Sequence, residues 1–123
     1  MPIRTNVQQG AVWCFPVLSW RVYDGDTVMD MRVDLGFGVS ITIDGRLVGI
    51  DTPELRGVSR EHGLMARDYL RSKMDAANTV EVVSTSFEVR QGKYGRWLVE
   101  IYADGVNLNR DLVEQGLAEY RSY

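Results

Sequence analysis

The sequence predicts a small α+β barrel, mainly β, because its hydrophobic period changes along the chain. Residues 27–34 and 39–43 alternate between apolar and polar positions, which is the pattern of half-buried strands. Residues 59–77 change to a spacing of three and four, through Leu70 and Met74, as in an amphipathic helix. Many strands with few helices favour strands that close on themselves, with the helices packed at one end.

The first half of the chain predicts three strands before this helix. Residues 11–23 are rich in aromatic and β-branched side chains and predict one or two strands, with Pro16 at a bend or edge. Two glycines within residues 35–38 predict a turn with positive φ. The Asp-Gly pair at 44–45 is interpreted as a bulge within one long strand that continues to Ile50.

The second half predicts two more strands and a short helix. Residues 79–89 have strand character, 90–96 form a loop with two glycines, and 97–105 are a strand ending in an Asp-Gly turn. Asn107 is suited to cap the short helix. Gly116 is suited to its C′ position, with the next leucine packing back in a Schellman motif.

Composition narrows the classes of function. A chain of 123 residues with 45% hydrophobic and 25% charged residues predicts a single globular domain over residues 1–123. One cysteine, Cys14, and one histidine, His62, give no zinc-ligand spacing. The net charge of −3 argues against broad electrostatic binding of nucleic acid. It permits a local site where a bound cation changes the sign of the field.

Polar residues cluster in four segments at the ends of the expected elements. They are "DGDT" at 24–27, "RLVGIDTPE" at 46–54, "KYGR" at 93–96 and the terminal "YRSY". Each segment alone is typical of a turn or a basic loop. Their combination in one short chain indicates a shared site.

The residue types in these segments suit metal-assisted chemistry on phosphate. Asp26 and Asp51 offer the hard oxygen ligands that calcium or magnesium prefers. Glu54 follows a proline that fixes the backbone, and it could hold or deprotonate a water molecule. Arg46 and Arg96 provide planar, permanently charged forks that match phosphate oxygens.

Two consequences follow from simple geometry and charge. Arg46 and Asp51 have opposite parity, so they meet at one site only if the strand ends or bends near Gly49. The three candidate carboxylates balance Arg46, Lys93 and Arg96, so the set is neutral until a cation binds. A bound dication would leave about +2 and attract a phosphate.

These motifs, in this order, resemble the staphylococcal nuclease (thermonuclease) family over roughly residues 20–120. The resemblance implies a five-stranded OB-fold barrel with two packed α-helices. It also implies a calcium-dependent nuclease that hydrolyses phosphodiester bonds of DNA and RNA. Single strands would be preferred, with metal-assisted attack of water leaving 3′-phosphate ends.

The resemblance assigns ten positions by motif match. Metal ligands are expected at Asp26, Asp51 and Thr52, the last through its backbone carbonyl. Catalytic roles are expected at Arg46, Glu54 and Arg96, with Glu54 as the proposed general base. Contacts to a terminal phosphate are expected at Lys93 and Tyr94, and stacking on a base at Tyr120 or Tyr123.

Departures from the family pattern leave alternatives open. The hairpin from Asp26 to Arg46 is longer, the loop after Glu54 is shorter, and most of the family's long C-terminal helix is absent. One alternative is a non-catalytic OB-fold module that binds single-stranded nucleic acid or a protein partner. Another is a structural domain whose charged turns are merely solvated. We expect a monomer without membrane association, and no protein partner is inferred.

The cellular compartment stays open. The apolar segment "AVWCFPVLSW" lacks a basic start and a small-residue cleavage site, so we interpret it as strand and loop, not as a signal peptide. A secreted mature form and a cytoplasmic protein are both compatible with this chain.

Overall fold

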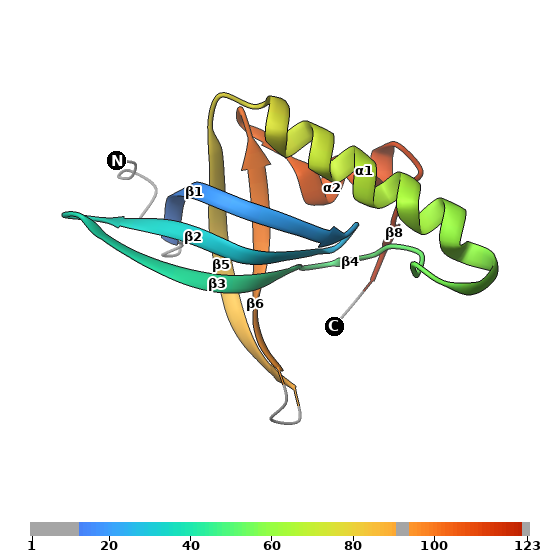
Figure 1. The fold of residues 1–123 in the computed structure, drawn as a ribbon, viewed down its shortest axis with the longest axis horizontal. Helices are drawn as coiled ribbons and strands as arrows, with labels where there is room; N and C mark the ends of the chain where they lie inside the picture. The colour runs from blue at the N-terminus through green and yellow to red at the C-terminus, as the bar shows by residue number, and fades with distance from the viewer. Residues whose placement is uncertain (1–12, 91–93, 122–123) are drawn as a thin grey trace.

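The computed structural model describes residues 13–90 and 94–121 (Figure 1). Its elements are, in chain order, β1 (Trp13–Asp24), β2 (Thr27–Gly36), β3 (Val39–Leu47), β4 (Ile50–Asp51), the 3-10 turn η2 (Gly57–Ser59), α1 (Arg60–Ala76), β5 (Val80–Arg90), β6 (Tyr94–Ala103), β7 (Val106–Asn107), α2 (Leu108–Glu114) and β8 (Glu119–Tyr120). No helix in the described ranges has the length and apolar character needed to cross a membrane.

Five strands close into the predicted barrel. These strands have the order β3-β2-β1-β5-β6, with the short β7 added beyond β6, and a parallel pairing of β3 with β6 closes the barrel through Gly45–Leu47 alongside Trp97–Val99. Both helices lie on the same side of this barrel (Figure 1). The α+β class and the five-stranded barrel with two packed helices are therefore confirmed.

The N-terminal apolar segment forms one long strand that changes partner part-way along. Residues 13–16 of β1 pair with β5, and residues from Val17 onward pair with β2. Pro16 lies at the change of partner, where a residue without an amide hydrogen is tolerated. A single strand can in this way belong to both sides of the barrel.

The irregularity near Asp44 lies on the partner strand. Val28 pairs with Gly45 and Met31 with Ile43, so two residues of β2 oppose the single residue Asp44. The bulged Asp30 has a positive φ of 53°, and its amide donates to Asp44 Oδ1 at 3.0 Å. The strand β3 passes through 44–45 as one strand, as predicted, but the bulge expected at Asp44–Gly45 is wrong, because the extra residue lies on β2.

Two predicted boundaries are wrong. The strand does not continue to Ile50, because β3 ends at Leu47 and a turn at Val48–Gly49 precedes the short β4. The expected loop over 90–96 is shorter, because the β5–β6 ladder continues to the pair Arg90 and Tyr94. The first error arises because β3 and β6, which are distant in sequence, pair only as far as Leu47, and the second because the β5–β6 hairpin pairs further toward its tip than the two glycines suggest.

The helix ends follow the local signals in the sequence. The side chain of Asn107 accepts the amide of Arg110 at 3.1 Å and caps α2. At the other end Gly116 has φ of 76° and Leu117 N donates to Leu112 O at 2.9 Å. This is the predicted Schellman motif.

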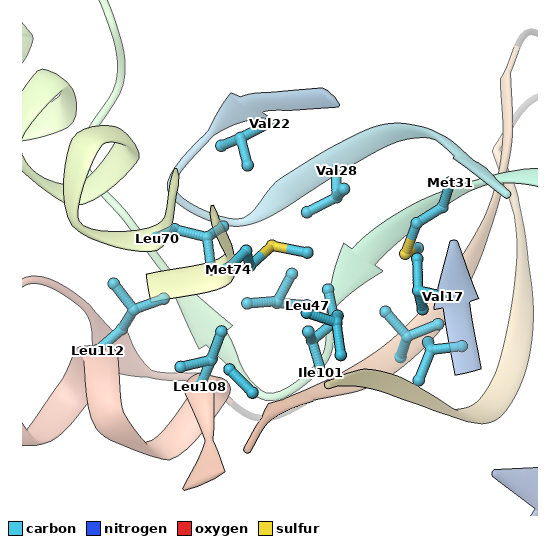
Figure 2. Close-up of a cluster of buried hydrophobic side chains, with 14 of the residues drawn as sticks. Val17, Val22, Val28, Met31, Leu47, Leu70, Met74, Ile101, Leu108 and Leu112 are labelled. Atoms are coloured by element: carbon cyan, nitrogen blue, oxygen red, sulfur yellow. The ribbon is translucent and has the colours of Figure 1, made fainter. Parts of the chain in front are cut away.

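A single hydrophobic core fills the space between the barrel and the helices (Figure 2). Helix α1 buries the predicted face through Ala66, Leu70 and Met74. The figure shows side chains from strands and from both helices meeting at Leu47, Ile101, Met74, Leu108 and Leu112. The helices are also joined to each other, because Tyr69 OH donates to Asp111 Oδ2 at 2.6 Å.

A buried amide on α2 holds the end of β3 against β6. Asn109 Nδ2 donates to Val48 O and Val99 O, each at 3.0 Å, and its Oδ1 accepts the amide of Ile101 at 3.2 Å. Asn109 is buried, and its bonds to Val48 O and Ile101 N take the place of water at these backbone groups, while Val99 O also accepts the amide of Val48. Asn109 of α2 thereby fixes the turn after β3, which leads the chain to Asp51.

We expect Asn109→Ala to lower the free energy of unfolding by about 2–4 kcal/mol, because it removes three hydrogen bonds to the backbone at the edge of the core. Urea unfolding followed by circular dichroism measures this loss. Asn107→Ala, which removes the cap of α2 and a long, partly buried bond to Tyr102 OH, is the matched control and should cost about 1 kcal/mol. If both variants lost the same free energy of unfolding, the proposed role of Asn109 in holding the end of β3 against β6 would be contradicted.

Candidate functional site

A cleft of about 450 Å³ opens where the β1–β2 turn, the end of β3, the segment after β4 and β6 meet. Its lining is rich in carboxylates and guanidiniums, with few apolar side chains. The lining residues are Tyr23, Asp24, Asp26, Thr27, Arg46, Asp51, Thr52, Pro53, Glu54, Leu55, Arg56 and Arg96.

The turn at Val48–Gly49 explains how Arg46 and Asp51 reach one site. Gly49 has φ of 83°, a conformation that other residues adopt only with strain. In a continuous strand the side chains of Arg46 and Asp51 would point to opposite faces, and the turn removes this restriction. Arg46 Nη2 then lies 3.1 Å from Asp51 Oδ1, so the bend expected near Gly49 is confirmed.

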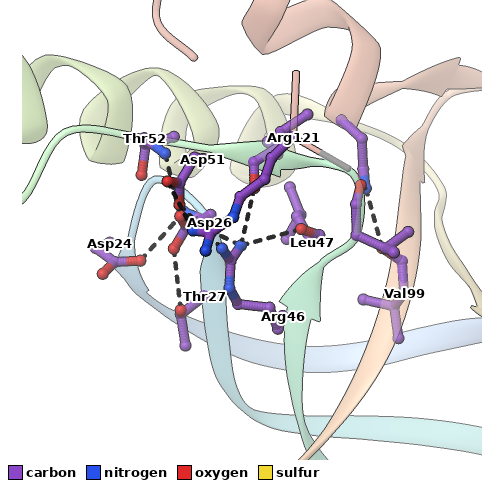
Figure 3. A network of polar contacts seen from close by, with 12 residues as sticks. Asp24, Asp26, Thr27, Arg46, Leu47, Asp51, Thr52, Val99 and Arg121 are labelled. Carbon is purple, nitrogen blue, oxygen red and sulfur yellow. Dashed lines mark hydrogen bonds and ion pairs between the residues drawn. The ribbon is translucent and has the colours of Figure 1, made fainter. Parts of the chain in front are cut away.

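The guanidinium of Arg46 is buried and held from several directions (Figure 3). Its Nη1 donates to Leu47 O at 3.1 Å and to Ile50 O at 3.2 Å, the two carbonyls that flank the turn. The same nitrogen lies 3.3 Å from Asp26 Oδ2. Arg46 thus joins both candidate metal-binding aspartates and fixes their separation.

Asp26 ties the β1–β2 turn to the segment after β4. Its Oδ2 accepts the amide of Thr52 at 3.1 Å, and its Oδ1 accepts the hydroxyl of Thr27 at 3.2 Å. These bonds and the ion pair with Arg46 fix the orientation of the Asp26 carboxyl group in the lining of the cleft.

Asp24 is a second carboxylate beside Asp26 that the sequence interpretation left without a role. Burial, and then the neighbouring charge of Asp26, raise the pKa of Asp24 from 3.8 to about 6. The Asp26 amide donates to Asp24 Oδ1 at 3.1 Å, which offsets part of this shift. The repetition of Asp in "DGDT" was the available signal, since residues two apart in a tight turn lie close together.

The register of the barrel brings Arg96 to the same cleft. Arg46 of β3 pairs with Leu98 of β6, and side chains two residues apart on a strand share a face. Arg96 therefore projects from the same side of the sheet as Arg46, and it lines the cleft. Two arginines that are 50 positions apart in the sequence are brought together by strand pairing alone.

Helix α1 supports the segment that carries Glu54. A Cβ on Gly63 would lie 2.8 Å from Pro53 O and would also collide with Glu54 O, so only glycine permits this approach. This close approach explains why α1 has a buried glycine in its first turns. The side chain of Glu54 is exposed at the rim of the cleft.

Some of the remaining predicted site residues lie outside the part of the chain that the structure describes. Lys93 and Tyr123 lie outside the described residues, and only the backbone of Tyr94 is described, at the start of β6. Tyr120 is exposed in β8, where it pairs with Ile50, and does not belong to the described lining of the cleft. His62 is exposed on α1 and is likewise absent from that lining.

Arg121 is a site residue that the sequence interpretation missed. Its Nη1 lies 3.0 Å from Asp51 Oδ2, on the opposite oxygen from Arg46. Nothing in the residues around it signals this pair, because the partners are 70 positions apart. The pairing of β8 with β4 is what brings them together.

The donor set fits a hard cation in its chemistry. The acidic side chains of the cleft offer oxygen atoms alone, which calcium and magnesium prefer. Within residues 13–90 and 94–121 no three His, Cys, Asp or Glu side chains gather as a metal site. Asp26 and Asp51 are instead bridged by Arg46, so a cation would have to share these carboxylates with a guanidinium.

A closed α+β barrel with two packed helices and a cleft of carboxylates and arginines belongs to the OB-like class of small barrel folds. The model of the family described as staphylococcal nuclease homologue matches residues 44–123, well over half of the chain. The chain belongs to this family. The matched region includes Arg46, Asp51, Glu54 and Arg96, while "DGDT" precedes it. Membership indicates a nuclease or nucleic-acid-binding function.

We expect Asp24→Asn to stabilise the fold at neutral pH. Because folding raises the pKa of Asp24 from 3.8 to about 6, its contribution to stability is complete below pH 3.8 and is lost as the pH rises through 6. The variant has no carboxylate to ionise, so its advantage over the wild type should grow between pH 4 and pH 6.5.

Urea unfolding in the presence of a chelator, at acidic and at neutral pH, measures this difference. Asp68→Asn, which removes an exposed carboxylate of α1 outside the cleft, controls for the loss of one negative charge. A stability difference for Asp24→Asn that does not depend on pH would contradict the assigned shift.

Proposed function

We propose that this chain is a calcium-dependent nuclease that hydrolyses phosphodiester bonds of DNA and RNA, prefers single strands and leaves 3′-phosphate ends. The observation that carries the proposal is the buried Arg46 that joins Asp26 and Asp51 in a cleft shared with Glu54 and Arg96. Family membership supports it, since staphylococcal nuclease homologues are generally calcium-dependent.

The metal ligands in this proposal are Asp26, Asp51 and the backbone carbonyl of Thr52. Asp26 already accepts the amide of Thr52, so both residues belong to one rigid unit. A bound calcium ion would supply positive charge to the scissile phosphate and lower the pKa of nearby water. The rest of the chemistry falls to side chains of the chain itself.

Arg46 and Arg96 would bind the equatorial oxygens of the phosphate, where negative charge grows during attack. A guanidinium held in a buried, hydrogen-bonded position pays little reorganisation energy at that moment, which is the main source of electrostatic catalysis. Arg46 meets this condition through its bonds to the carbonyls of Leu47 and Ile50.

Glu54 would accept the proton of the attacking water at a carboxylate oxygen. Its exposed place at the rim allows water to reach it, and the close packing of Gly63 holds its backbone in place. We further propose that Lys93 and Tyr94 contact a terminal phosphate, and that Tyr120 or Tyr123 stacks on a base.

A specific observation favours the alternative of a non-catalytic module that binds single-stranded nucleic acid or a protein partner. Both carboxylate oxygens of Asp51 are paired with guanidiniums, those of Arg46 and Arg121. If these pairs persist in the presence of calcium, the cleft would be a fixed polar surface without metal chemistry.

We expect the chain to release nucleotides from denatured DNA when calcium is present and to stop when a chelator is added. The reason is that the cleft carboxylates need a cation before the site can attract a phosphate. Acid-soluble nucleotide release measures the activity. Absence of activity in calcium and in every other divalent ion, with folded protein, would exclude the enzyme and favour the binding module.

We expect Arg96→Gln to lower kcat by roughly 100- to 1,000-fold, the scale seen when one preorganised contact to a developing charge is lost. Arg32→Gln, on the β2–β3 hairpin and outside the cleft lining, removes the same charge and should leave kcat unchanged. Steady-state cleavage of a short single-stranded DNA compares the two. Unchanged kcat and kcat/KM in Arg96→Gln would refute the role.

A further inference from the structure

Asp51 receives one arginine on each of its carboxylate oxygens, from two different parts of the chain. Arg46 Nη2 lies 3.1 Å from Oδ1, and Arg121 Nη1 lies 3.0 Å from Oδ2 (Figure 3). Each oxygen keeps a second lone pair, but a cation that approaches it is repelled by the guanidinium already paired with that oxygen.

The two arginines differ in how firmly they are held. The side chain of Arg46 is 10% exposed and donates to two backbone carbonyls, whereas the side chain of Arg121 is 54% exposed. Exposed ion pairs contribute little to stability and exchange readily with solvent. Of the two pairs on Asp51, that with Arg121 is therefore the one that a cation can displace.

The backbone places Arg121 beside Asp51 independently of its side chain. Ile50 and Asp51 pair with Tyr120 and Glu119 in the β4–β8 ladder, and Arg121 N donates to Gly49 O at 2.8 Å. The side chain consequently starts next to Asp51 whatever its charge. A substitution at position 121 can then change the charge without removing the strand pairing.

Arg121 changes the net charge that a cation meets near Asp51. The described lining carries four carboxylates and three guanidiniums, an excess of one negative charge. Arg121 lies at the edge of this set and adds a positive charge beside Asp51. A dication approaching the aspartates therefore meets less negative charge with Arg121 in place than without it.

From this geometry we propose that Arg121 is a positioning residue that competes with the divalent cation for Asp51 and thereby lowers the metal affinity of the site. The inference rests on the proposed metal role of Asp51. In the metal-free protein Arg121 holds Oδ2 of Asp51, and metal binding requires its guanidinium to move away from that oxygen.

Calcium titration calorimetry of the folded, metal-free chain tests the competition without relying on activity. We expect Arg121→Gln to bind calcium about two- to fivefold more tightly than the wild type, the range set by an exposed ion pair. Arg121→Lys keeps the charge and should bind like the wild type. Arg32→Gln removes a charge outside the cleft lining and should also match it.

A double-substitution cycle with Asp51→Asn separates competition for Asp51 from a general charge effect. If Arg121 acts through Asp51, Arg121→Gln should give no gain in calcium affinity when Asp51 is already Asn. A gain of the same size in both backgrounds would overturn the proposal. So would calcium binding by Arg121→Gln that is equal to or weaker than that of the wild type.

The two proposals fail in different ways. If neither the wild type nor Arg121→Gln binds calcium, the metal role of Asp51 is wrong and the competition is excluded with it. If the wild type binds and loses binding in Asp51→Asn while Arg121→Gln changes nothing, the metal site stands and only the role of Arg121 is overturned. Urea unfolding midpoints confirm that each variant is folded.

Discussion

The buried guanidinium of Arg46 is the interaction on which the rest of the site depends. It binds the two carbonyls on either side of the Val48–Gly49 turn and both aspartates of the cleft. A buried cation of this kind is stable only when its donors are satisfied, so the turn and the aspartates must keep their places. The barrel provides this, since β3 is paired on both sides at Arg46.

The barrel and helices also fix the backbone of the segments that line the cleft. Asn109 of α2 fixes Val48, and Gly63 of α1 lets the helix contact the backbone before Glu54. Both helices thus act on the segment between β3 and α1, which carries the candidate metal and catalytic groups. The polar groups reach the cleft from strand ends and turns, where side chains can point away from the core.

Local signals predicted much of the fold. The periodicity of α1, the Asn107 cap and the Schellman motif at Gly116 depend on neighbours a few residues away, and all three are found. The end of β3 at Leu47 depends on pairing with β6, which is distant in sequence, whereas the bulge at Asp30 and the start of β6 at Tyr94 depend on the register within their hairpins. For the site, residue types indicated Arg46, Asp51 and Arg96, but Arg121 is revealed only by the β4–β8 pairing.

The most direct measurement is a crystal structure of the chain with calcium and a short single-stranded DNA that has a non-hydrolysable linkage. The account predicts a calcium ion on carboxylate oxygens of Asp26 and Asp51, and a phosphate within hydrogen-bonding distance of Arg46 and Arg96. Glu54 should face the phosphorus from the side of the attacking water. A DNA bound elsewhere on the barrel, with Asp51 still paired to both arginines, would contradict it.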